Sequence, residues 1–524
     1  MALTEAPHDS ETLITEAVAP TTVRPPASAV ERVLSTADHV TIGRMFVGFS
    51  LGFGVIGLVV SALLNFDTAA FDSATRSGLF SAAAAARLAA NEGTGLLLCC
   101  ALPLLLGLAV LIVPRQIGSP VLSFGRAAAL SMWTWLLASI VFLVSVAADG
   151  SYGGTNIKLA RLGNVAVGTL MVALLIGGVC VAVTVFTQRP AGMGLSDVPF
   201  FSFSMVVSVS IWVLSLPAVL AHVVLAHIVQ PSAADLAKAF NDGISWYLRQ
   251  PSIYVAVIPV LGLAADVAAT AVGGRHRFRG SLHVAIGAAG ALSFGAWVQT
   301  PIAQDTAVWV VMCIAFGLPV LIVLGAVADT LRGGDTQLIA PLGFAVSALL
   351  LALLGSLVGV LAAIDTAGKD KLMGLGADAL NRGLLYLILG AAITGAVGGC
   401  FYWARQGFGG SLPDGVGRAL VPLSLLAVSL WGLPHLILGV AQAKSPTADA
   451  SVLAGISGFG ALLVGLVVLV TLASGLRVRS EAGRGDALVA DPWGGAGTLE
   501  WAEAGSDPAV VDSPYPLLDA KGGE

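Results

Sequence analysis

The sequence predicts an all-α polytopic membrane protein with about twelve transmembrane helices. Two observations lead to this fold class. First, 56% of the 524 residues are hydrophobic and only 11% are charged, which is more apolar surface than the core of a soluble domain can remove from water. Second, the apolar residues form about twelve runs, each close to the ~20 residues that a helix needs to cross a hydrocarbon layer of about 30 Å.

Each run is bounded by charged residues or by glycine and proline, which are typical of helix ends. The second run shows this most clearly, because it has no charge from Gly93 to Val113 and is followed by Pro114, which cannot continue a helix, and by Arg115. The expected helices lie near residues 44–65, 93–113, 127–147, 163–187, 201–229, 253–273, 281–299, 306–328, 338–364, 382–403, 418–440 and 450–475.

These helices form one expected membrane domain, residues 41–476, between two polar tails. Residues 1–40 lack the apolar stretch of a secretory signal, and residues 477–524 are rich in Gly, Asp and Pro, so both are expected to be flexible. An even number of helices places both tails on one side of the membrane. The loops on that side are mostly basic, whereas the opposite loops carry at least as many acidic as basic residues. The positive-inside rule therefore predicts a plasma-membrane protein with both termini in the cytoplasm.

Composition also limits the partners. A net charge of -5 offers no footprint for nucleic acid, whereas the hydropathy requires contact with membrane lipid. All five cysteines lie inside apolar runs, so the sequence has neither a CxxC metal motif nor a disulfide framework.

The stretch from Asn91 to Arg126, NEGTGLLLCCALPLLLGLAVLIVPRQIGSPVLSFGR, carries the most specific motif. It resembles the second transmembrane helix and following loop of subunit I of the heme-copper oxidases, whose pattern is close to HGT, then P, then LGLANYLVPLQIGAPDMAFPR. The positions in step are Gly93, Thr94, Pro103, Gly107, Leu108, Ala109, Val113, Pro114, Gln116, Ile117, Gly118, Pro120, Phe124 and Arg126.

The resemblance extends along most of the membrane domain. Residues 37–44 match the family motif ADHKTIGR, residues 189–200 match RAPGM and MPLF, and residues 246–262 keep the frame of its W, HPEVY and LPGFG segment. Such matches, in order, imply the twelve-helix fold of subunit I. They also imply an oxidase that uses heme and copper and works with other oxidase subunits.

The ligand positions that the resemblance implies hold no histidine. Leu and Gly offer no donor atom, and Gln or Thr oxygens are poor partners for iron and copper sites that imidazole suits. We therefore expect no metal and no bound cofactor at these positions. The positions are Glu92 and Leu385 for the low-spin heme, Gly383 for the high-spin heme, and Gln250, Gln299 and Thr300 for copper.

The proton-uptake positions of the family have become neutral as well. The Asp, Glu and Lys that the resemblance implies correspond here to Val121, Ser252 and Val323. Tyr254 keeps the place of the family tyrosine that is linked to a copper histidine. Because Gln250 stands in place of that histidine, a packing role is expected for Tyr254.

Glu92 has two interpretations. It is either an interfacial acid that caps the start of its helix, or a carboxylate that replaces a heme ligand or binds a cation. The seven histidines form no obvious substitute site, because His222 and His227 are five residues apart on one helix and point about 140° away from each other. A relocated heme held by a single histidine remains open.

These residues lead to three alternative functions. Loss of every ligand favours a non-catalytic scaffold or subunit of an oxidase-like complex. The alternatives are a terminal oxidase of aerobic respiration, as the family resemblance by itself implies, and an ion or small-molecule pathway. That pathway would be lined by Glu92, Gln250, Ser252, Gln299 and Thr300.

Overall fold

The computed structural model describes residues 34–70, 78–239, 247, 251–300, 303–304, 306–367, 376–445, 448–481, 491–502, 511 and 513–522. At 251–253, 296–300, 303–304, 306, 366–367 and 521–522 it describes the backbone alone. By its internal contacts the chain divides into Met1–Thr36, described only at 34–36, and Ala37–Glu524. All elements named below belong to the second unit.

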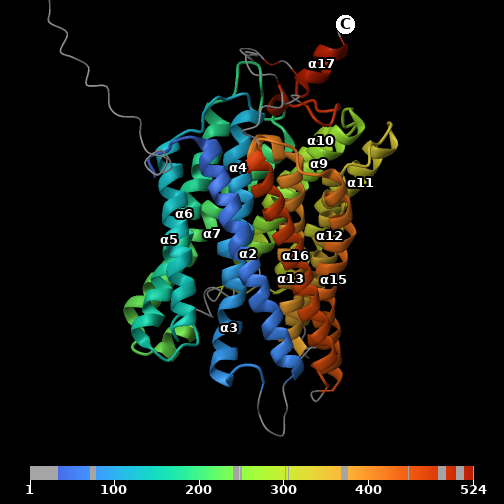
Figure 1. Cartoon of the computed structure of the whole chain (residues 1–524). Coiled ribbons are helices and arrows are strands. Elements are labelled where there is room, and N and C mark those ends of the chain that lie inside the picture. The colour runs from blue at the N-terminus through green and yellow to red at the C-terminus, as the bar shows by residue number, and fades with distance from the viewer. Residues whose placement is uncertain are drawn as a thin grey trace, which may run out of the picture. The chain divides into compact units, whose positions relative to one another are not determined.

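Long helices make up most of the described residues, which confirms the all-α membrane fold (Figure 1). Eleven of the described helices are long and apolar enough to cross a membrane. The elements are α2 (His39–Ala70), α3 (Ala82–Gly95), η1 (Leu96–Ala101), α4 (Leu102–Gln116), α5 (Gly125–Ala147), α6 (Ile157–Thr187), α7 (Phe200–Val229), α9 (Pro251–Val272), α10 (Arg279–Leu292), η2 (Ser293–Val298), α11 (Thr306–Arg332), α12 (Ala340–Ala367), α13 (Ala377–Tyr402), α14 (Ala404–Phe408), α15 (Asp414–Lys444), α16 (Ser451–Glu481), η5 (Leu499–Trp501) and α17 (Pro516–Gly522).

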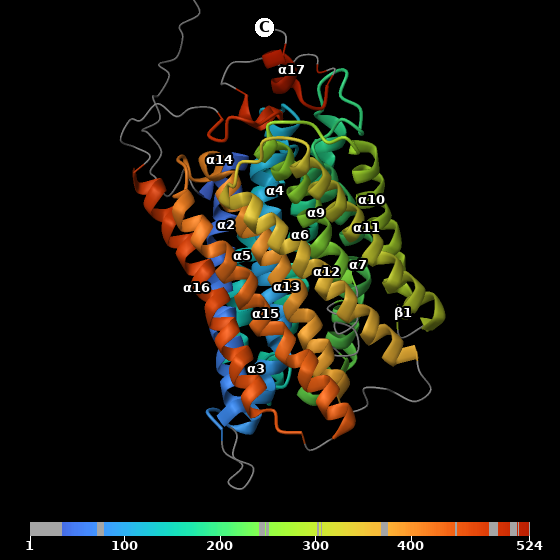
Figure 2. The ribbon, with the colours of Figure 1, turned by 90° about the vertical axis from the view of Figure 1, so that its right-hand side faces the viewer.

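The expected helix at 281–299 differs from the rest. Here α10 ends at Leu292 and continues as the 3-10 helix η2, so it falls short of the length of a single membrane-spanning α-helix. Together the two helices extend about 33 Å, at roughly 1.5 and 2.0 Å per residue. Two strands of two residues each follow, β1 (Gln299–Thr300) and β2 (Ala303–Gln304). They pair antiparallel beside α11 (Figure 2). Gln299 and Thr300 therefore lie on a strand, not on the expected helix.

The helix ends gather at two ends of the bundle. One end, here called the tail end, joins the loops before α5, α7, α10, α12 and α15 to the C-terminal residues. Hydrogen bonds that connect it include Arg279 Nη2 to Val198 O at 3.0 Å, Gln406 Nε2 to Glu500 O at 2.7 Å and Val511 N to Ala191 O at 3.0 Å. Figures 1 and 2 show α17 at this end and α3 at the opposite one.

Three membrane passes form the centre of the bundle. The most apolar windows of α3–η1–α4, α9 and α13 are 94–100% buried, whereas those of the surrounding helices are only 39–56% buried. A helix that is apolar on all sides can be buried on all sides, and the outer helices expose their apolar side chains as lipid-facing helices do. The two stretches that carry the expected heme positions, 82–116 and 377–402, are therefore both central.

The helix around Glu92 is longer than expected. It begins at Ala82 rather than Gly93, with Ser81 as its N-cap, and it continues two residues beyond Pro114 to Gln116. Between α3 and α4 it widens into the π-helix η1. Pro103 explains this widening, because it cannot donate to Cys99 O and its ring pushes that carbonyl away. In η1, Leu98 O accepts a hydrogen bond from Trp135 Nε1 at 2.9 Å.

The C-terminal residues are not the solvated tail that composition predicts from residue 477. Helix α16 runs on to Glu481, and residues 491–502 pack against the tail end with Glu500 and Trp501 only 3% and 2% exposed. Aromatic side chains within a Gly-rich segment provide the packing, which composition averaged over the whole tail hides. Of the first 40 residues, 1–33 lie outside the described part of the chain.

A matched pair of glycines on α16 tests the helix packing. A Cβ at Gly460 would lie 2.4 Å from the backbone nitrogen of Trp431, whereas a Cβ at Gly455 would be 3.7 Å from Ala69 Cβ, an ordinary contact. Both Gly→Ala changes raise helix propensity alike. We expect G460A to be less stable than G455A by about 1–3 kcal/mol, the usual cost of overpacking. Thermal unfolding of the two variants in one detergent measures the difference, and equal midpoints would contradict the contact.

Candidate functional site

Glu92 lies inside the protein and not at a helix start. The N-cap of its helix is Ser81, whose Oγ accepts from Ala84 N at 3.3 Å, about three turns before Glu92. The expectation that Glu92 caps the helix is therefore wrong. Its side chain is 9% exposed, and its Oε1 accepts a hydrogen bond from the Tyr386 hydroxyl of α13 at 2.8 Å.

Tyr386 belongs to a buried group of polar and aromatic side chains, here called the Glu92 cluster. Its ring stacks on Trp431 of α15, with centroids 4.4 Å apart and an interplanar angle of 15°, and meets His435 edge-on at 5.2 Å. Helix α2 supplies the partners of both: Trp431 Nε1 donates to Ser61 Oγ at 3.0 Å, and His435 Nε2 bonds to Asn65 Oδ1 at 2.9 Å. The cluster thus ties together α2, α3, α13 and α15.

Arg382 lies one turn before Tyr386 and interacts electrostatically with Glu92. Sequence analysis missed most of this cluster. One signal was present: Ser61 and Asn65, Trp431 and His435, and Arg382 and Tyr386 are each spaced i, i+4, which places each pair on one face of its helix.

The other two expected heme positions offer no ligand. Leu385 has no donor atom and packs half-buried against the core. Gly383 faces α15 so closely that an added Cβ would lie 2.9 Å from Gly432 O and 3.2 Å from His435 Cβ. A histidine would not fit at Gly383 without moving α15. The residues at these described positions therefore do not fit the axial ligands of a heme pair.

The copper positions are only partly described. Gln250 lies outside the described residues, and the backbone alone is given for Ser252, in α9, and for Gln299 and Thr300, in β1. Their roles stay predictions. Among the described residues, no group of three or more His, Cys, Asp or Glu side chains could hold a metal ion.

The remaining expected positions have ordinary surroundings. Val121 is 55% exposed at the tail end, and Val323 is buried in α11. Tyr254 is buried and meets the Phe316 ring edge-on at 4.5 Å, in keeping with the expected packing role. On α7, His222 is exposed and His227 is half-buried.

His276 is buried outside the membrane-spanning helices. Its ring nitrogens bond to Thr330 Oγ1 at 2.7 Å and to Ala265 O at 2.8 Å. Burial, the largest cause, lowers its pKa to about 4. A neutral imidazole that bridges two helices explains this residue.

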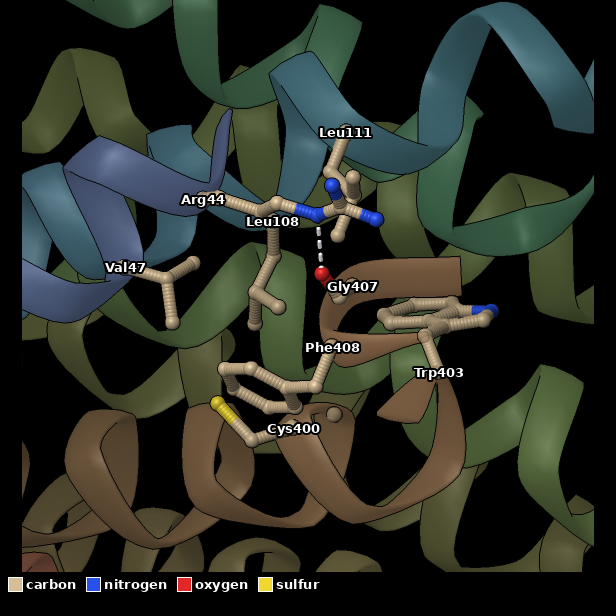
Figure 3. A pocket seen from close by; sticks show the side chains of 9 residues that line it. Arg44, Val47, Leu108, Leu111, Cys400, Trp403, Gly407 and Phe408 are labelled. Carbon is tan, nitrogen blue, oxygen red and sulfur yellow. Dashed lines mark hydrogen bonds between the residues drawn. The ribbon is translucent and has the colours of Figure 1, made fainter. Parts of the chain in front are cut away.

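Two small cavities touch the central helices. One, of about 60 Å³, lies beside Glu92 and is lined by Asn91, Cys99 and apolar side chains of α2 and α5. The other, of about 10 Å³, lies near the tail end, where Figure 3 shows the Arg44 guanidinium bonded to Gly407 O above Phe408 and Cys400. Volumes of this size suit one or a few waters and are far smaller than a heme.

Comparison with known proteins identifies the family to which this architecture belongs. Residues 41–472 match the family described as Cytochrome C and Quinol oxidase polypeptide I. The Heme-copper oxidase subunit I+III of Aeropyrum pernix is 25% identical over 510 residues, which is 90% of this chain and 60% of that protein. Cytochrome c oxidase subunit 1 of Bacillus subtilis is 24% identical over 528 residues, which is 93% of this chain and 80% of that protein.

A solved structure supports the fold at lower identity. A heme-copper terminal oxidase dimer studied by cryo-EM aligns with a TM-score of 0.56 at 11% sequence identity, covering 95% of this chain and 90% of that one. The family match spans most of the chain, and the helices occupy the expected positions. This chain therefore belongs to the family of subunit I of the cytochrome c and quinol oxidases.

Proposed function

We propose that this chain is a subunit I-like membrane protein that has lost its heme and copper ligands and acts as a non-catalytic scaffold or subunit of an oxidase-like membrane complex. The observation that carries this proposal is the direct hydrogen bond between Tyr386 and Glu92. It joins two of the three central passes, at the level where the family resemblance implies two histidines on either side of a heme.

The energetics of the Glu92 cluster favour a structural role. A buried carboxylate is costly unless hydrogen bonds or opposite charges compensate it. Tyr386 supplies that hydrogen bond. Because Tyr386 is itself held by Trp431, the cluster fixes four helices relative to one another.

The proposed partners are other oxidase subunits and lipid. The names of the relatives are those of oxidase subunits, one of them a subunit I+III. The outer helices expose aliphatic side chains such as Leu225 and Ile228 on α7 and Val311 on α11. Such surfaces suit lipid chains or the helices of a neighbouring subunit.

The proposed orientation places the tail end in the cytoplasm of a cell whose plasma membrane holds the protein. Arginines concentrate at that end, among them Arg115, Arg126, Arg189, Arg275, Arg277, Arg279, Arg332, Arg405, Arg418, Arg477 and Arg479. The positive-inside rule then assigns it to the cytoplasm. Both termini would lie on that side.

Family membership by itself favours a catalytic terminal oxidase. The residues at Glu92, Gly383 and Leu385 count against it. The ion-pathway alternative has less support, because the cavity beside Glu92 measures only about 60 Å³.

The absorption spectrum separates the scaffold from the oxidase. Purified full-length protein, expressed with heme and copper supplied, is expected to show no Soret band, no stoichiometric iron or copper and no oxygen consumption with cytochrome c or quinol. Glu92→His is expected to change none of this, because Leu385 still provides no second ligand. The Aeropyrum heme-copper oxidase, prepared in the same way, is the positive control. One or two hemes per chain in the purified protein would overturn the proposal.

A double-mutant cycle tests the hydrogen bond that supports the proposal. Tyr386→Phe leaves a buried carboxylate short of a donor and is expected to cost about 1–3 kcal/mol. In the double variant with Glu92→Gln, the loss of unfolding free energy is expected to differ from the sum of the two single-variant losses by about 0.5–3 kcal/mol. Tyr254 is another buried tyrosine on a central helix, so Tyr254→Phe is the matched control. Its effect on the free energy of unfolding is expected to add to that of Glu92→Gln. Strict additivity for Tyr386→Phe, measured by thermal unfolding, would show that the bond contributes nothing.

A further inference from the structure

Residues 491–502, here called the docked segment, make a specific contact with the tail end of the bundle. Its backbone turns through η5, which places Glu500 and Trp501 inward. Gly495 lies against α9, where an added Cβ would be 2.4 Å from Thr270 O. Such close approach between backbones indicates a fitted surface.

Side chains at the ends of α13 and α14 hold this segment. Trp501 Nε1 donates to the Tyr402 hydroxyl and Trp493 Nε1 to Tyr402 O, each at 3.3 Å. Gln406 Nε2 donates to Glu500 O at 2.7 Å. These contacts place the Glu500 carboxyl between α4, α9 and α13.

That carboxyl group shares one donor with a second carboxylate. Gln116 Nε2 donates to Glu500 Oε1 at 3.0 Å and to Asp266 Oδ2 at 3.2 Å. Because Ser202 Oγ donates to Gln116 Oε1 at 2.6 Å, the amide is oriented with its NH₂ group toward both acids. Trp403 Nε1 also donates to Glu500 Oε1, at 3.4 Å.

The two acids differ in what else they bind. Asp266 accepts hydrogen bonds from Phe200 N at 3.0 Å and Phe201 N at 2.9 Å, at the N-terminus of α7, where the helix dipole favours a negative charge. Glu500 Oε2 is buried and, within the described part of the chain, has no hydrogen-bond partner. An unpaired, buried carboxylate oxygen beside a second buried carboxyl group is best satisfied by a proton.

We propose that Glu500, with Asp266 and Gln116, forms a proton-binding site that controls docking of residues 491–502. The segment docks tightly when the Glu500 carboxyl is protonated and is held more weakly when it ionises next to Asp266. This inference does not depend on whether the chain binds heme.

Among the described residues, no ion pair joins Glu500 to a cation, because the nearby arginines bond to other groups. On α4, Arg115 donates to Gln406 Oε1, and on α10, Arg279 donates to the carbonyls of Ser196 and Val198. On α14, Arg405 donates to Ser411 Oγ at 3.2 Å. The titratable groups that face Glu500 are Asp266 on α9 and the Tyr402 hydroxyl on α13, which is bonded to Thr270 at 2.7 Å.

The electrostatics fix the direction of the pH dependence. Burial, as the main cause, and Asp266 raise the pKa of Glu500 from 4.5 to about 7. The docked state therefore binds the proton more tightly than the released state. The equilibrium constant for docking is therefore largest below about pH 4.5. It falls by up to about tenfold per pH unit between 4.5 and 7, and it stays constant above pH 7.

Hydrogen exchange of the full-length protein in lipid nanodiscs tests this. The protection of peptide 491–502, corrected for intrinsic exchange rates, is expected to fall by up to about tenfold per unit from pH 5 to pH 7. Glu500→Gln is expected to keep the segment protected at every pH. Glu481→Gln, which removes an exposed carboxylate paired with Arg477 on α16, is the matched control and is expected to behave as wild type.

Three results would overturn the proposal. They are protection that does not change with pH in the wild type, a Glu500→Gln variant with the same slope as the wild type, and a Glu500→Gln variant that is unprotected throughout. A titration with sodium or calcium chloride at fixed pH adds a further check. Protection that follows the cation and not the pH would assign the two acids to a metal ion.

Discussion

Inside a bilayer, each buried polar group must find its partner within the protein, because lipid offers none. This constraint explains the unusual features of the central helices. In the π-helix, Leu98 O lies five residues before Pro103, which has no N–H to donate, and Trp135 Nε1 donates to this carbonyl instead. Glu92 receives the Tyr386 hydroxyl, and Asn164 donates to Val223 O at 2.9 Å while accepting from the Tyr152 hydroxyl. The bonds of Trp135, of Tyr386 and from Asn164 to Val223 each join two helices, so at these places satisfying a polar group also fixes helix positions.

The chain buries a carboxylate near each end of its central helices, and the two surroundings differ. Glu92 accepts a hydrogen bond from the Tyr386 hydroxyl, which belongs to a group of side chains from four helices. Glu500 is buried beside a second carboxyl group, and both conditions favour its neutral form, although its hydrogen bond from Gln116 favours the charged form. The first arrangement suits a permanent structural contact, whereas the second suits a contact that responds to protons.

The family fold persists in this chain although identity to its relatives is only about 25%. Glycine and small residues at the helix contacts account for part of this, as at Gly383 against Gly432 and Gly460 against Trp431. These contacts depend on backbone proximity and not on any cofactor. Such contacts can hold the subunit I helix arrangement through large changes in sequence.

The sequence alone determined the fold class and the helix positions to within a few residues for most helices, because hydropathy and Gly or Pro boundaries are local properties of the chain. The resemblance to the family, and not any property of the residues alone, directed attention to Glu92, Gly383 and Leu385. Only the tertiary structure decided what these residues contact. Glu92 and Tyr386 are 294 positions apart, so no local pattern links them. The same holds for Glu500, because the composition of a Gly-rich segment predicts exposure to solvent and does not show that its side chains contact α4, α9 and α13.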